Sequence, residues 1–148
     1  MTLATRFKAD AALANDGVWF PFPESPNIDK TVPAFLLGRN SGQNRRFSRA
    51  LAEVTARYLA EHDVKGIEEL DEDVQDQFDI DLFLEGCLLD WRNFQPNDDG
   101  ENVEYSAEAA REILGHPDWS DLYNLLRTKA IITANYRGDK EKADAGNS

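Results

Sequence analysis

One stretch in the second half of the chain limits the possible folds more than any other. Residues 90–119 read DWRNFQPNDDGENVEYSAEAAREILGHPDW. A mostly apolar segment runs into Trp91, and the polar residues 96–100 predict a turn. Ser106 is a typical helix N-cap, and Pro117 stops the helix that follows it. The stretch holds neither a nucleophile beside a base nor a cluster of metal ligands. We interpret it as a joint between helices in a protein that acts through its surface, and we expect no enzymatic activity.

Two short strands are predicted in the N-terminal third of the chain. Residues 17–22 are aromatic and β-prone, and Pro21 places this strand at a sheet edge because proline donates no hydrogen bond. Residues 34–38 predict the second strand, and the turn-rich linker between the two favours antiparallel pairing. A hairpin alone is marginal in water, so we expect it to lie against helices.

Four longer segments predict helices. The first begins at Gln43 or Asn44, ends at His62–Asp63, and has an apolar face made of Phe47, Leu51, Val54 and Tyr58. The second is predicted from Asp71 to Arg92 and the third over Ala107–Leu114. The fourth begins at Asp118 or Ser120, with a stripe made of Trp119, Leu122, Leu126, Ala130 and Thr133. The predicted fold is therefore α+β and mainly α, with a three- to four-helix core and a small N-terminal antiparallel β-hairpin.

The length of 148 residues favours one domain. We place that domain at residues 1–136 and predict a disordered tail over 137–148, because the tail has no apolar anchor. No apolar run approaches the ~20 residues that a membrane-spanning helix needs. The N-terminus also lacks the apolar core of a secretory signal. We therefore expect no membrane association.

Negative charge is concentrated in the middle of the chain. From Glu61 to Glu104 there are 16 acidic residues, against Lys65 and Arg92 alone, whereas the whole chain carries a net charge of −12. This acidic belt repels phosphates, so nucleic-acid binding through it is not expected. A basic cluster precedes the belt and consists of Arg39, Arg45, Arg46 and Arg49. The cluster is expected to pair with the belt, within one chain or between copies in a homo-oligomer.

Residues for catalysis or for cofactor binding are scarce. Cys87 is the one cysteine and lies in an apolar run, which predicts a small buried side chain. His62 and His116 are placed at helix ends, where surface or capping roles are typical. The turn at residues 95–106 lacks the first and last carboxylates of a calcium loop. We expect neither a metal nor a cofactor.

Residues 90–119 also carry a family resemblance. A Trp at a helix end, an Asp/Asn-rich turn with Gly, a short extended piece and a Ser before a helix resemble the tail assembly chaperones of long-tailed bacteriophages. Three more segments resemble that family in the same order, namely FKADAALANDGVWF at 7–20, FLLGRNSGQNRRF at 35–47 and the ending GNS at 146–148.

The resemblance implies a function and a partner. Such chaperones bind and solubilise the tape measure protein during tail morphogenesis, and the tail tube protein is a second candidate partner. The family's place of action is the host cell cytoplasm, outside the mature virion. The family motif marks five candidate partner-binding residues here: Arg39, Asn44, Trp91, Phe94 and Tyr105.

Two other classes of function remain open from the sequence. One is a structural head–tail or tail-completion protein, which would be found in purified virions. The other is an acidic DNA-mimic inhibitor, whose belt would bind a basic DNA-handling enzyme and release it at high salt.

Overall fold

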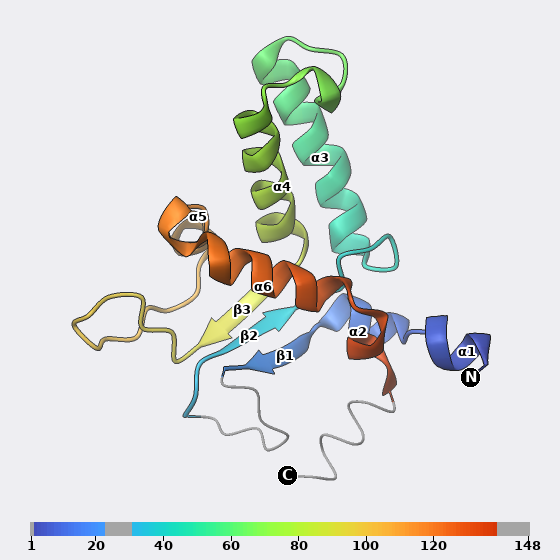
Figure 1. Ribbon diagram of the computed structural model, residues 1–148, viewed down its shortest axis with the longest axis vertical. Coiled ribbons are helices and arrows are strands. Elements are labelled where there is room, and N and C mark those ends of the chain that lie inside the picture. The colour runs from blue at the N-terminus through green and yellow to red at the C-terminus, as the bar shows by residue number, and fades with distance from the viewer. Residues whose placement is uncertain (1, 23–30, 139–148) are drawn as a thin grey trace.

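The element boundaries follow from local capping and pairing. The computed structural model describes residues 2–22 and 31–138. It is mainly helical with a three-stranded antiparallel sheet, which confirms the predicted α+β, mainly α class (Figure 1). The elements are α1 (Leu3–Phe7), α2 (Ala11–Asp16), β1 (Val18–Pro21), β2 (Ala34–Leu37), α3 (Arg45–His62), η1 (Ile67–Glu69), α4 (Glu72–Gly86), β3 (Leu88–Arg92), α5 (Ala107–Leu114), η2 (Pro117–Trp119), α6 (Ser120–Ile131) and η3 (Thr133–Tyr136). The predicted tail lies outside the described residues from position 139 onward.

The predicted N-terminal hairpin is confirmed. β1 and β2 pair antiparallel, with Val18 opposite Leu37 and Pro21 opposite Ala34. The sheet order is β1-β2-β3, so β1 and its proline lie at an edge, as expected. Gly17 joins α2 to β1 with φ 89, a conformation that disfavours residues with a Cβ.

The predicted helix over Asp71–Arg92 is wrong in its last part. α4 ends at Gly86, and Leu88–Arg92 form β3, which pairs antiparallel with β2. β2 would otherwise have one edge unpaired, and the apolar and aromatic residues of this run suit a strand as well as a helix. A Cβ on Gly86 would lie 3.1 Å from Phe47 Cα, so α3 and α4 approach closely at this point.

α3 and α4 form a long antiparallel pair that extends away from the sheet (Figure 1). Its outer part has its own apolar cluster of buried residues, namely Val54, Tyr58, Leu70 and Phe78. The predicted face of α3 is correct at Val54 and Tyr58 but wrong at Leu51, which is 43% exposed. Ala50 is buried instead, because α4 meets α3 along the line of Ala50, Val54 and Tyr58.

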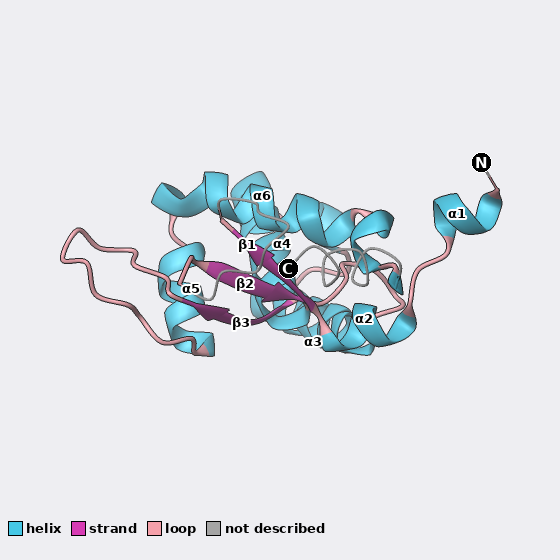
Figure 2. Cartoon of the chain, turned by 90° about the horizontal axis from the view of Figure 1, so that it is seen from below, coloured by secondary structure: helices cyan, strands magenta, loops and turns pink. Residues whose placement is uncertain are grey.

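The main core lies between one face of the sheet and the helices α4, α5 and α6. Figure 2 shows α6 running across the sheet. On α6, Leu126 and Ala130 are fully buried as predicted, and Tyr123 is also buried. η3 then brings Tyr136 into the core, where its hydroxyl donates to Leu37 O at 3.1 Å. No helix within residues 2–22 and 31–138 is long and apolar enough to cross a membrane.

Candidate functional site

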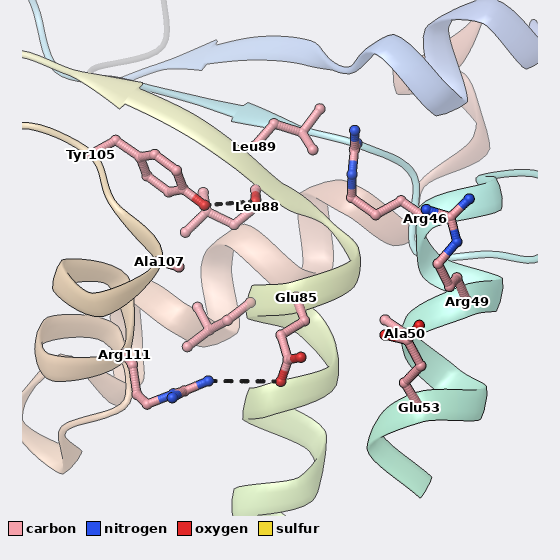
Figure 3. A pocket seen from close by; sticks show the side chains of 11 residues that line it. Arg46, Arg49, Ala50, Glu53, Glu85, Leu88, Leu89, Tyr105, Ala107 and Arg111 are labelled. Atoms are coloured by element: carbon pink, nitrogen blue, oxygen red, sulfur yellow. Dashed lines mark hydrogen bonds and ion pairs between the residues drawn. The ribbon is translucent and has the colours of Figure 1, made fainter. Parts of the chain in front are cut away.

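An open groove lies between the first half of α3, the junction of α4 with β3, and the start of α5 (Figure 3). Its volume is about 490 Å³. Eleven side chains from these elements and the preceding loop line it: Arg46, Arg49, Ala50, Glu53, Leu84, Glu85, Leu88, Leu89, Tyr105, Ala107 and Arg111. The groove therefore joins parts of the chain that are far apart in sequence.

Asn44 fixes the walls of this groove relative to each other. Its Oδ1 accepts from Arg46 N at 3.0 Å, which caps α3. Its Nδ2 donates to Arg39 O at 3.0 Å and to Gly86 O at 2.9 Å. Gly86 is the last residue of α4, so one fully buried amide connects the start of α3, the loop after β2 and the end of α4.

The floor of the groove is apolar. Leu84, Leu88 and Ala50 are buried beneath it, and Leu89 is half-buried. The Tyr105 hydroxyl donates to Leu88 O at 3.3 Å, a contact that orients the tyrosine along the groove (Figure 3). Burial is the main cause that raises the pKa of Tyr105, and the nearby Asp90 adds to it. This tyrosine is therefore neutral at physiological pH.

The rim of the groove is charged. Glu85 accepts from Arg57 Nη2 at 2.6 Å and lies 3.9 Å from Arg111 Nη2. The hydrogen bond that Arg57 donates to Glu85 is the largest cause of the raised pKa of Arg57. Arg46 and Arg49 are exposed and form no ion pair with any acidic side chain in the described part of the chain. The groove thus presents free arginines above apolar surface.

The joint between the sheet and α5 is an aromatic cluster. Trp91 Nε1 donates to Val103 O at 2.7 Å, and Val103 N donates to Phe94 O at 2.8 Å. The Phe94 ring packs edge-on against Trp91 at 5.1 Å and against Trp119 at 5.4 Å. These contacts hold together the two ends of the loop between Phe94 and Val103. Residues 103–105, predicted as an extended piece, join no strand among the described elements.

The five predicted partner-binding residues have different environments. Tyr105 lines the groove, and Arg39 is half-buried, with its guanidinium donating to Gln43 Oε1 at 2.7 Å and Thr133 Oγ1 at 3.0 Å. Asn44, Trp91 and Phe94 are at most 5% exposed. Buried side chains stabilise the fold but offer little surface to a partner. Contact of these five residues with a partner stays a prediction.

Sequence reasoning found part of the groove's basic rim. The sequence identifies the basic cluster, and the structure separates its members. Arg39 turns inward, whereas Arg46 and Arg49 line the groove. Within one chain the predicted pairing of the cluster with the acidic belt is not seen among the described residues, where Arg57 and Arg111 pair with Glu85 instead. Pairing between copies stays a prediction. Arg111 was missed because no local pattern links α5 to α3.

The residues suited to catalysis are not gathered in this groove. Cys87 is fully buried, as predicted, and burial raises the pKa of its thiol to about 12. His62 stacks on Tyr58, and His116 Nδ1 accepts from Asp118 N at 3.1 Å, which are the expected end positions. No three His, Cys, Asp or Glu side chains within the described ranges are grouped to hold a metal ion.

The part of the chain that carries the groove matches the model of a known protein family. A family model described as YdaY prophage protein matches residues 42–147, which include every residue that lines the groove. No curated protein and no solved structure is significantly similar to the chain.

Proposed function

The chain belongs to the YdaY prophage protein family, and from this phage origin we propose that it is a tail assembly chaperone. In this role it binds the tape measure protein in the host cytoplasm, keeps it soluble, and leaves before the virion is complete. The resemblance at residues 90–119 supports the role, and the groove between α3, β3 and α5 supports the manner of binding.

The groove has the features that suit a helix of another protein. Amphipathic helices bind in grooves whose apolar floor receives the helix's apolar face. Leu88 and Leu89 supply such a floor, and the groove is open to solvent above it. Arg46 and Arg49 have no acidic partner in the described chain, so they are available to carboxylates that flank an apolar stripe. This combination of floor and rim is the observation that carries the proposal.

The net charge of −12 suits the same role. A long amphipathic protein exposes apolar stripes that aggregate. Many bound copies of an acidic protein cover those stripes and turn their belts to solvent, and their mutual repulsion keeps the complex dispersed. Each contact is modest, and many copies on one chain add up to stable but reversible coverage.

Co-expression with the tape measure protein of the same prophage tests the proposal. We expect the wild-type chain to raise the soluble fraction of the tape measure protein. The double variant Arg46→Glu, Arg49→Glu should remove most of this effect, because it replaces both free cations of the rim. The matched control is Arg45→Glu, Lys65→Glu, which makes the same change of charge at exposed positions outside the groove.

Two results would contradict the proposal. One is an unchanged soluble fraction of the tape measure protein when the wild-type chain is present. The other is detection of the chain by mass spectrometry as a stoichiometric component of purified virions. The second result would favour the structural head–tail or tail-completion role.

A further inference from the structure

The segment that begins the chain exposes apolar side chains. Leu3 is 77% exposed and Phe7 is 60% exposed, more than any other large apolar residue in the described ranges. α1 projects from one end of the molecule (Figures 1 and 2), where it contacts η3 and Arg6 O accepts from Arg137 Nη2 at 2.6 Å. The charges between positions 2 and 9 are Arg6 and Lys8, with no acidic residue. We call residues 2–8 the arm, a basic segment with an apolar side.

A second groove has the opposite charge. It lies between the first half of α4 and the corner from α5 to α6, with a volume of about 460 Å³. Asp73, Asp76 and Asp79 line its α4 side and Arg127 lines it from α6, and none of the three aspartates forms an ion pair within residues 2–22 and 31–138. Ile80 and Leu114 line it too, so it offers apolar surface beside its carboxylates. We call it the acidic groove.

A buried polar group in the acidic groove lacks a partner. Tyr123 lines the groove and is only 6% exposed. Its hydroxyl forms no hydrogen bond with any described residue. A buried hydroxyl without a partner is unfavourable, so this wall of the acidic groove is not fully satisfied within one copy.

The geometry points to the arm of a second copy as the occupant of the acidic groove. The arm brings exposed apolar side chains and two cations, and the acidic groove brings apolar surface and unpaired carboxylates. In one copy alone the apolar side chains of the arm stay exposed, Arg6 lies over the ring of Phe7, and the groove's aspartates form no ion pair with described residues.

The arm of the same copy cannot reach the acidic groove. α1 packs beside η3, past the C-terminal end of α6, whereas the acidic groove borders the N-terminal part of α6. The 12 residues of α6 span about 18 Å. Lys8–Asp10, which join α1 to α2, reach about 10 Å when extended. Asp10 N is also held by Tyr136 O at 2.7 Å, so docking requires another molecule.

Net charge does not forbid this association. Two molecules of charge −12 repel, but the Debye length is about 8 Å at physiological ionic strength. Charges that are farther apart than this are largely screened. A docked arm would place Arg6 and Lys8 within about 8 Å of the groove's aspartates. The contact is independent of the groove in Figure 3, so its failure leaves the proposed function untouched.

Sedimentation velocity over a range of protein concentrations tests the inference. We expect the wild-type chain to associate, and Leu3→Ser, Phe7→Ser to raise the apparent dissociation constant by on the order of a hundredfold, because two apolar side chains are no longer buried. Asp73→Lys, Asp76→Lys should also weaken association. Both pairs of positions are exposed, so the variants should fold.

Matched controls separate docking from general surface effects. Leu125→Ser, Ile131→Ser removes two exposed apolar side chains elsewhere, and Glu108→Lys, Glu112→Lys reverses two exposed charges on α5. Neither should change association. A mixture of the arm variant with the acidic-groove variant should still form a one-to-one pair, because one intact arm meets one intact groove.

Three outcomes would overturn the inference. The first is a wild-type chain that stays monomeric at all concentrations. The second is equal weakening by a control pair and by its matched test pair. The third is a mixture of the arm and acidic-groove variants that does not pair.

Discussion

At the scale of single residues, Asn44 has the largest structural role for its size. It is fully buried, caps α3, and donates to the carbonyl oxygens of Arg39, in the loop after β2, and of Gly86, at the end of α4. We expect Asn44→Ala to lower the free energy of unfolding by about 3 kcal/mol, through the lost cap and the unpaired buried carbonyls. Urea unfolding followed by circular dichroism measures the loss.

Asn44→Asp shows which atoms of Asn44 matter, and Ser106→Ala gives the cost of losing an exposed cap for comparison. Asp is an equally good N-cap, but it would place a carboxylate oxygen against the carbonyls of Arg39 and Gly86. Asn44→Asp should therefore be no better tolerated than Asn44→Ala. Ser106→Ala removes an exposed cap on α5, where Ser106 Oγ accepts from Ala109 N at 3.0 Å, and should cost about 1 kcal/mol. Full stability in Asn44→Asp would show that the cap alone matters.

At the scale of elements, α3 begins with the wrong charges for its own stability. Its first turn has no acidic residue, and Arg45 and Arg46 lie there, at the positive end of the helix dipole. α4, in contrast, begins with Glu72 and Asp73. Of these two arginines Arg46 lines the groove, so a residue proposed to bind the partner lies where a cation lowers helix stability.

A stability measurement checks this interpretation of α3. Arg45→Glu should raise the free energy of unfolding by about 0.5 kcal/mol, since it replaces an exposed cation by an anion in the first turn. The gain should shrink in high salt, which screens exposed charges. A loss of stability in low salt would mean that Arg45 has a favourable contact that the dipole argument omits.

The elements also show how far the sequence predicts the fold. Asn44, Ser106 and Gly17 mark boundaries through contacts with residues nearby in the chain, so the starts of α3 and α5 and the end of α2 could be predicted. The end of α4 could not, because β3 exists only where β2 offers it an edge. The basic rim was likewise predicted on α3 alone, since Arg111 reaches it only through the tertiary fold.

At the scale of the whole molecule, buried tyrosines make stability depend on pH. Burial is the largest cause that raises the pKa of Tyr58, Tyr123 and Tyr136 above the ordinary 10.0, and it raises that of Tyr123 to about 12. Above pH 10 the unfolded chain therefore binds fewer protons than the folded chain. The free energy of unfolding then falls as pH rises. We expect the urea midpoint to decrease between pH 10 and pH 12.

Tyr123→Phe is the control for this pH dependence. It removes one raised tyrosine, so the alkaline decrease should be smaller than in the wild type. The variant should also be tolerated at neutral pH, because the hydroxyl has no hydrogen-bond partner among the described residues. An unchanged alkaline decrease would show that Tyr123 ionises as readily in the folded chain as in the unfolded one.

The position of Tyr136 has a consequence for how the protein is made. Its ring is fully buried, and its hydroxyl binds the backbone of Leu37, 99 positions earlier in the chain. The sheet and its covering helices therefore cannot close completely until translation has passed position 136. We therefore expect a chain that ends a few residues before Tyr136 to have an open core and to be degraded faster by proteases.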